Sequence, residues 1–309
     1  MKKILAVLFA CLVSTSSFAD AFKIISSFPA GSGPDRLLRE YAEELSVQWR
    51  TPVVVDPRPG AAGSLAMNAH LADPANSVLA VANGEFIGHP ILNNNATLVN
   101  QLKPLSVLVV SDLVLATSTK TENFDALKTR VQKKSTFGSW GVGTLPHVAG
   151  LQFSEALGST DVVHAPYIQY GPWFVDIASQ KLDFSFVTIA STRELEKAGK
   201  LKYIAVLSTK RNSDYPNVPT INELVGNAVT YESVWFGLYA SKSLPADRLK
   251  KLEADTINIS TNSEKVNAVR KQLYYQGMPG QTVDRIEKMI NDERARNQAA
   301  FKKYNISIK

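Results

Sequence analysis

Short apolar runs alternate with amphipathic segments along the chain, which is the pattern of strand–loop–helix units. An apolar run at 23–28 precedes a segment at 35–49 whose apolar residues recur at helical spacing. Apolar runs at 53–55 and 78–82 have the length and composition of strands buried on both faces of a parallel sheet. We therefore predict a right-handed βαβαβ unit whose strand ends meet at one edge of a sheet.

A second set of similar elements begins near residue 135. Its predicted strands cover 135–137, 162–167, 183–189 and 201–208, and its helices begin near Pro146 and Pro172. The run 105–117 is long enough to cross from the first set to the second. A chain of 309 residues suits two domains or one bilobal domain. The predicted fold class is α/β.

Three further helices are predicted after residue 240, near 246–259, 263–276 and 282–303. Ser263 is a favourable N-cap for the middle helix, and Gly277 is a favourable C′ residue. The middle helix is therefore expected to end just before Gly277.

Glycine-rich loops stand between several predicted strands and helices. The loop at 28–35 leads into a helix with Pro34 in its first turn, and the loop at 137–147 leads into one that starts with Pro146. A third glycine loop lies at 58–64. The free amides at such helix starts can bind an anion. The first loop matches neither the Walker A pattern nor the dinucleotide fingerprint, which argues against a nucleotide ligand. Because the loops at 28–35 and 137–147 can each bind an anion, we predict a cleft in which they together hold a small anion.

The first 19 residues have the pattern of an export signal. Lys2 and Lys3 precede an apolar run at 4–13, and Ser17 and Ala19 occupy the −3 and −1 positions of a cleavage site. We predict cleavage after Ala19 and a periplasmic protein. A lipoprotein acylated at the single cysteine, Cys11, is the alternative, although Phe9 suits that motif poorly. No later stretch approaches the roughly 20 apolar residues of a membrane-spanning helix.

Charge and composition exclude several classes of function. The formal charge is +6, with basic and acidic residues interspersed, so a nucleic-acid partner is not expected. The four histidines, His70, His89, His147 and His164, show no metal-ligand spacing, and no Gly-x-Ser-x-Gly elbow is present. We expect no metal, no cofactor and no catalytic site.

The order of several motifs identifies a family. The chain resembles the solute receptors of tripartite tricarboxylate transporters, the Bug or TctC family, over residues 22 to 309. The matching motifs are Phe28-Pro29-x-Gly31 with Asp35, Pro52-Val53-Val54-Val55 before Arg58-Pro59-Gly60-Ala61-x-Gly63, Gly143-Thr144 with His147-x-Ala149-Gly150, Val163-His164-x-Pro166-Tyr167, Gly199-Lys200-Leu201, Pro216-x-Val218-Pro219-Thr220, and Trp235-Phe236-Gly237-Leu238.

The resemblance implies a two-lobed periplasmic binding protein fold of type II-like architecture that closes on a small carboxylate. Lobe 1 would comprise 20–117 and 236–309, lobe 2 would comprise 118–232, and the hinges would lie at about 105–117 and 233–240. The implied partners are a carboxylate ligand and membrane transporter subunits, and the protein is expected to be a monomer. The residues expected to line the site are Phe28, Ala30, Gly31, Ser32, Gly33, Asp35, Gly63, Ser64, Asn83, Glu85, Trp140, Val142, Gly143, Thr144, His147, Tyr167, Gln169 and Tyr170.

Several positions at this site differ from the family pattern. Val142 stands where the family has an asparagine, and Ile168-Gln169 replaces the usual Lys-Gly. Aromatic residues Trp140, Tyr170 and Trp173 lie on or beside the loops. These differences favour an aromatic or partly apolar carboxylate over citrate, unless the aromatic side chains pack as core beneath the loops. Glu85 is either a surface residue or an acceptor for a ligand hydroxyl or amine.

Two classes of function remain after these exclusions. A solute receptor explains the leader, the two glycine loops and the lack of a catalytic constellation, whereas an enzyme explains none of them better. Within the receptor class, the partner is a transporter or, alternatively, a membrane sensor kinase.

Overall fold

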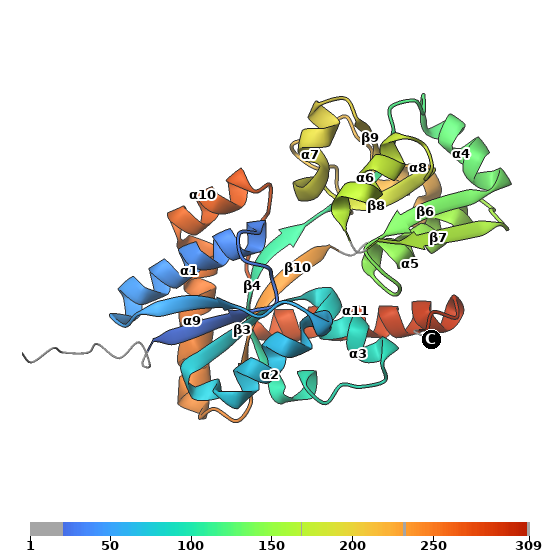
Figure 1. The fold of residues 1–309 in the computed structure, drawn as a ribbon. Coiled ribbons are helices and arrows are strands. Elements are labelled where there is room, and N and C mark those ends of the chain that lie inside the picture. The colour runs from blue at the N-terminus through green and yellow to red at the C-terminus, as the bar shows by residue number, and fades with distance from the viewer. Residues whose placement is uncertain (1–20, 168, 231–232, 308–309) are drawn as a thin grey trace, which may run out of the picture.

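The protein forms two separate β-sheets, each flanked by helices (Figure 1). The computed structural model describes residues 21–167, 169–230 and 233–307. The predicted leader and Ile168 lie outside the described residues. The predicted α/β fold with a helix-flanked sheet in each half is confirmed.

The first sheet contains the predicted parallel unit. Strand β1 (Phe22–Ser26) pairs in parallel with β2 (Val53–Pro57) on one side and with β3 (Ser77–Ala82) on the other. Strands β10 (Val234–Ser241) and β4 (Leu102–Ser111) complete the sheet, in the order β2-β1-β3-β10-β4. Strand β10 pairs antiparallel with both β3 and β4. The carboxyl ends of β1, β2 and β3 therefore lie at one edge, as predicted.

Amphipathic helices cover both faces of the first sheet. On α1 (Gly33–Trp49), Leu37, Leu38, Tyr41 and Leu45 are buried at the predicted helical spacing, in one core with Ile24 and Val78 of the sheet. The opposite face has a second core with Ile25 and Leu79. The other helices of this half are α2 (Ser64–Ala72), α3 (His89–Leu92), α9 (Ala246–Asn262), α10 (Glu264–Gln272) and α11 (Val283–Lys303).

The second sheet has the order β7-β6-β8-β5-β9. Its strands are β5 (Leu113–Ser118), β6 (Ser135–Ser139), β7 (Val162–Pro166), β8 (Phe184–Thr188) and β9 (Leu201–Leu207). Its helices are α4 (Phe124–Lys133), α5 (Leu145–Ala156), α6 (Tyr170–Ala178), α7 (Ile189–Lys197) and α8 (Ile221–Val225). Short helical turns elsewhere are η2 (Ala61–Gly63), η3 (Pro74–Asn76), η4 (Gly84–Gly88), η5 (Val99–Gln101) and η6 (Gly226–Ala228).

The chain changes sheets at Asp112. β4 pairs within the first sheet up to Ser111, and β5 pairs with β8 and β9 of the second sheet from Leu113. The predicted crossing run 105–117 is thus two strands, and 113–117 lie in the second sheet although they were assigned to lobe 1. On the return, Val234 is already paired in the first sheet, two residues before the expected boundary. Hereafter, lobe 1 denotes 21–111 with 234–307, and lobe 2 denotes 113–230.

The middle C-terminal helix, α10, is shorter than predicted. Ser263 caps it as expected, with its hydroxyl accepting the Val266 amide at 3.2 Å. The helix ends at Gln272, however, and the left-handed residue beyond it is Tyr274, with φ of 57°. Gly277 is therefore not the C′ residue. The backbone turns early because Gln276 exchanges two backbone hydrogen bonds with Val110 on β4.

Candidate functional site

The glycine loop of lobe 2 lies close to α3 of lobe 1. A Cβ at Gly143 in lobe 2 would lie 2.3 Å from Leu92 Cδ1 on α3 of lobe 1. The backbone of Gly143 also has φ of 75°, a conformation that side chains disfavour. Only glycine fits here without rearrangement, and this close approach packs the lobe 2 loop against α3 of lobe 1.

The first loop is held in shape by a buried carboxylate. Asp35 accepts the Gly31 amide at 2.9 Å and the Arg39 guanidinium at 2.9 Å, and it is 1% exposed. Ser32 caps α1 by accepting the Asp35 amide at 3.3 Å. Asp35 was predicted to line the site, but its carboxylate is satisfied by the loop itself. Ala30, Gly31, Ser32 and Gly33 remain open enough to meet a ligand.

A second carboxylate joins three loops of lobe 1. Glu85 Oε2 accepts the Ser27 hydroxyl at 2.5 Å and the Ala82 amide at 3.1 Å, which ties the end of β1 to the end of β3. Its side chain also lies beneath Gly63, where a Cβ would come within 3.1 Å of it. Burial raises the pKa of Glu85, although the two hydrogen bonds oppose that shift. The neighbouring Ser64 hydroxyl donates to Ala61 O.

Asn83 connects lobe 1 elements away from the loops. Its amide donates to Glu293 on α11 at 2.8 Å and accepts the Trp235 amide at 3.4 Å, and the residue is 5% exposed. The Trp235 indole also donates to Glu293, at 2.8 Å. Asn83 therefore fixes the start of β10 against α11, and any contribution it makes to ligand binding is indirect.

The loop of lobe 2 is organised around Ser139 at the end of β6. Ser139 Oγ accepts the Gly141 amide at 3.1 Å and donates to Gly141 O at 2.9 Å. Thr144 Oγ1 donates to the same carbonyl at 2.7 Å. Val142, between these anchored residues, is half-buried. The loop thus has a defined shape before α5 begins.

Two stacked histidines are hydrogen-bonded to this loop. The rings of His147 and His164 lie 3.8 Å apart at an interplanar angle of 17°. His147 Nδ1 accepts the Gly143 amide at 2.9 Å, and His164 Nε2 lies 2.7 Å from Ser139 Oγ. Burial lowers the pKa of His147 to about 4. Burial and the neighbouring His147 lower the pKa of His164 to about 3. Both rings are therefore neutral at pH 7.

We expect the free energy of unfolding to fall as the pH is lowered from about 6.5 towards 4. The ordinary pKa of 6.5 applies to His147 in the unfolded chain, whereas the folded value is about 4. The unfolded chain binds more protons in this window, so the stabilisation is complete above pH 6.5 and is lost as the pH falls. Urea unfolding at pH 7 and pH 4.5 measures the loss.

In His147→Gln, the loss of stability between these two pH values should be smaller than in wild type by on the order of 2 kcal/mol. Val175→Ala is a suitable control because Val175 is exposed and has no titratable group, whereas burial also lowers the pKa of His89. An equal pH dependence in wild type and His147→Gln would contradict the buried neutral state of His147.

The predicted aromatic residues of lobe 2 have different environments. Trp173 is 1% exposed and its indole donates to Ser185 Oγ at 2.9 Å, so it is core. Trp140 is half-buried with its ring edge-on to Trp173. The Tyr167 phenol donates to the Asp176 carboxylate at 2.7 Å. Tyr170, at the start of α6 after the exposed Gln169, remains 57% exposed.

Two aromatic residues of lobe 1 that were not predicted from the sequence, Phe236 and Tyr275, lie beside the first glycine loop. The Phe28 ring lies 4.6 Å from that of Phe236 on β10, and Phe236 lies 5.8 Å from Tyr275. The Tyr275 hydroxyl would be 3.4 Å from a Cβ at Gly33, so it lies beside the first turn of α1. Phe236 belonged to a quoted motif, whereas Tyr275 was placed inside a predicted helix.

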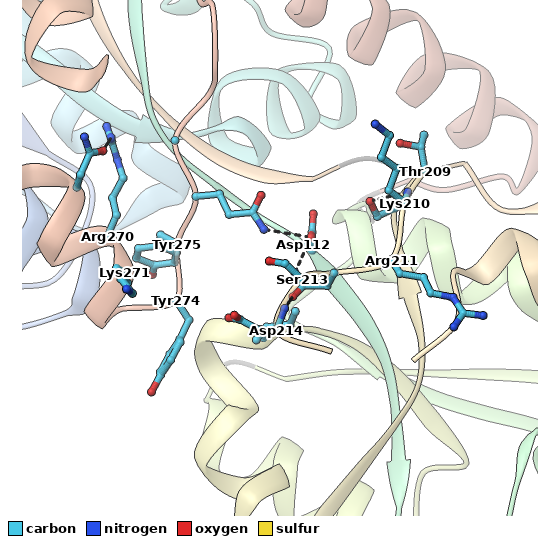
Figure 2. Close-up of a pocket in the computed structure, with 16 residues that line it drawn as sticks. Asp112, Thr209, Lys210, Arg211, Ser213, Asp214, Arg270, Lys271, Tyr274 and Tyr275 are labelled. Atoms are coloured by element: carbon cyan, nitrogen blue, oxygen red, sulfur yellow. Dashed lines mark hydrogen bonds between the residues drawn. The ribbon is translucent and has the colours of Figure 1, made fainter. Parts of the chain in front are cut away.

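A cavity of about 520 Å³ lies beside the crossing point between the lobes (Figure 2). Residues 208–214 of lobe 2 and 270–277 of lobe 1 line most of it. Asp112 lies within it and accepts the amides of Asn212 at 3.0 Å and Gln276 at 3.5 Å, one from each lobe. None of the predicted site residues lines this cavity, but Tyr275 does. The cavity therefore adjoins the loop region without coinciding with it.

Within the described ranges, no group of three or more His, Cys, Asp or Glu side chains is arranged to hold a metal ion. None of the helices in the part of the chain that the structure describes is long and apolar enough to cross a membrane.

This fold and these loops define a two-lobed solute-binding protein. The family model for the tripartite tricarboxylate transporter family receptor, TctC, matches residues 37–306, and the chain belongs to this family. The resemblance inferred from the sequence is thus confirmed, and the family is one of periplasmic solute receptors rather than enzymes.

Relatives and solved structures agree with this assignment. A UPF0065 protein of Bordetella pertussis is 24% identical over 264 residues, which cover 81% of each chain. The periplasmic binding protein BugD has a TM-score of 0.75 and 23% identity, covering 94% of this chain and 99% of BugD. The R. palustris protein Rpa4515 with adipate has a TM-score of 0.78 and 19% identity, covering 93% of this chain and 98% of that one. These structures share the fold.

Proposed function

We propose that this receptor binds a small carboxylate between its two lobes and delivers it to the membrane subunits of a tripartite tricarboxylate-type transporter. The observation that carries the proposal is the pair of proline-started helices, α1 and α5, one in each lobe and each preceded by a glycine loop, with the loop of α5 packed against α3 of lobe 1. Helix starts of this kind place free amides and the positive end of the helix dipole next to an anion.

The electrostatics of the loops support a carboxylate held by backbone groups. No lysine or arginine is among the predicted site residues, and the charge of Asp35 is already paired with Arg39. Glu85 is occupied by the Ser27 hydroxyl and the Ala82 amide within lobe 1. A carboxylate that accepts amides from both loops would gain charge-assisted bonds worth about 1.5–3 kcal/mol each. Those bonds would favour the closed arrangement of the lobes.

The ligand is proposed to be partly apolar or aromatic. Trp173 no longer supports this proposal because it is core, but Phe28, Phe236 and Tyr170 add aromatic surface near the loops. The adipate of the R. palustris neighbour has a four-carbon apolar middle and is a useful reference ligand. A ligand with apolar surface would gain about 25 cal/mol for each Å² it buries.

The proposal includes export and a single-chain receptor. The leader at 1–19 would be removed after Ala19, and the mature receptor would act as a periplasmic monomer. A membrane sensor kinase is the alternative partner. Co-purification of the receptor with membrane subunits encoded beside its gene would separate a transporter from a kinase.

Thermal-shift screening tests ligand binding directly. We expect at least one small carboxylate in a panel of malate, citrate, adipate, benzoate and 3-phenylpropanoate to raise the melting temperature. A ligand at 100 times its Kd stabilises by about 2.7 kcal/mol. Small-angle X-ray scattering with that ligand should show compaction, because the clamp draws the lobes together. Stabilisation by the corresponding amides and not by the carboxylates would contradict the proposal.

A further inference from the structure

Tyr275 lies at the junction of the first loop, the crossing strands and the cavity. Its hydroxyl is beside Gly33 in the first turn of α1, and its ring packs edge-on to Phe236, with an interplanar angle of 84°. Leu273 also lies against Gly33, so the end of α10 covers the start of α1. A ligand held at this helix start would therefore meet the Tyr275 side chain.

Backbone hydrogen bonds on both sides fix the position of Tyr275. Tyr274 has φ of 57°, which reverses the chain after α10, and the Tyr275 amide donates to Arg270 O at 2.9 Å. On the other side, Gln276 is bonded to Val110 on β4. The Tyr274 ring points away from Tyr275 towards lobe 2, where the Arg193 guanidinium lies 3.9 Å from its centre (Figure 2). Tyr275 is thus held from both sides.

Tyr170 lies at the start of α6 in lobe 2. Its ring stacks on Phe174 and Trp173 at the start of α6, and more than half of it is exposed. Burial and, to a smaller extent, the nearby Tyr170 phenol raise the pKa of Tyr275 to about 12. The Tyr275 phenol therefore keeps its proton at neutral pH.

These two phenols are distinguished by their lack of partners. Among tyrosines in the described ranges, all others except Tyr239 have a side-chain hydroxyl in a hydrogen bond. Tyr239 is fully buried beneath Phe86, whereas Tyr170 is 57% exposed and Tyr275 lines the cavity beside the crossing point between the lobes. A hydroxyl that is left unpaired beside a helix start is available to donate to a carboxylate.

We propose that Tyr170 and Tyr275 are ligand-contacting residues on opposite lobes and that they select a carboxylate with a flat apolar body. This inference rests on the proposed function. The Tyr275 hydroxyl donates to the carboxylate at the start of α1, and the two rings enclose the body of the ligand as the lobes close. A flat apolar body matches two aromatic faces, because stacking adds to the area buried.

Isothermal titration calorimetry of single variants tests the proposal. The probes are adipate, benzoate and 3-phenylpropanoate, and the variants are Tyr275→Phe, Tyr275→Ala and Tyr170→Ala. Tyr275→Phe removes only the hydroxyl and should raise Kd about tenfold for every carboxylate that binds wild type. Tyr275→Ala and Tyr170→Ala should raise Kd for the aromatic probes about tenfold more than for adipate. Tyr215→Phe is the matched control, because its phenol binds Glu196 within lobe 2.

The outcomes separate this inference from the function on which it rests. If wild type binds none of the probes or the other carboxylates of the panel, the carboxylate function and this inference both fail. If wild type binds a probe and Tyr275→Phe binds it equally well, the inference alone fails. Should Tyr275→Ala not fold, ultraviolet difference spectra provide a second readout. Ligand binding should perturb tyrosine absorbance in wild type, less so in Tyr275→Phe, and an equal perturbation would overturn the assignment.

Discussion

Trp173→Ala should lower the free energy of unfolding by about 3–5 kcal/mol, the cost typical of emptying a fully buried aromatic site. Trp173 is 1% exposed and packs with Val114, Ile177 and Val187 in the core of lobe 2. Its indole nitrogen also lies so near Gly138 that a Cβ there would come within 2.5 Å of it. The substitution therefore leaves a cavity and deprives Ser185 of a donor.

Urea unfolding followed by far-ultraviolet circular dichroism measures this loss. Val175→Ala is the matched control, since Val175 is on the same helix but 63% exposed, and it should cost less than about 1 kcal/mol. A loss below 1 kcal/mol for Trp173→Ala would show that Trp173 is not core. Such a result would restore the interpretation that placed Trp173 beside the ligand.

Asp35→Ala should weaken binding of a clamped carboxylate by roughly tenfold to a hundredfold, as a loss of about 1–3 kcal/mol would imply. The substitution removes the acceptor of the Gly31 amide and the partner of Arg39. The first loop would then have to be ordered by the ligand, and that cost reduces affinity. Calorimetry with the tightest carboxylate of the panel gives the change in Kd.

Two controls interpret the Asp35 result. Asp35→Asn keeps an oxygen that can accept the Gly31 amide, so we expect it to retain more affinity than Asp35→Ala. Arg39→Ala removes a side chain that is 55% exposed, and its effect on affinity should be small. Wild-type affinity in Asp35→Ala would contradict the view that this carboxylate shapes the first loop.

The parallel unit of lobe 1 could be predicted because its signals are local. The spacing of Leu37, Tyr41 and Leu45 fixes the buried face of α1. The apolar runs that form β2 and β3 are too short for helices and too apolar for surface loops, which indicates buried strands. The glycine loops were also predictable, because a proline in the first helical turn marks where each helix begins. Local sequence thus located both halves of the candidate site.

The direction of individual side chains could not be predicted. Asp35 and Asn83 lie in the expected segments, yet both side chains are bound by the protein itself. Trp173 follows Tyr170 by three residues on α6, but one is core and the other is exposed. The partners of Asn83 and the burial of Trp173 depend on groups that α11 and the second sheet bring near. The partners of Asp35, Gly31 and Arg39, are instead only four residues away on either side.

The end of α10 shows how a tertiary contact overrides a local signal. Gly277 was the best C′ residue in sequence, but the bridge between Gln276 and Val110 requires the helix to end earlier. Tyr274 then takes the left-handed conformation despite its side chain. Tyr275 was therefore predicted to lie inside the helix, whereas it lies beyond the end of α10. The crossing point was likewise marked only by the polar pair Ser111-Asp112 between two mostly apolar stretches.

A crystal structure of the protein with the carboxylate that stabilises it most tests the central claim most directly. We predict that the carboxylate oxygens lie within about 3 Å of the Gly33 amide in lobe 1 and of the Val142 amide in lobe 2. The other amides at 31–32 and at 141–144 already donate within the protein. The ligand would then contact both lobes at once. A ligand bound to one lobe alone, or bound in the cavity beside Asp112 with both loops unoccupied, would contradict the account.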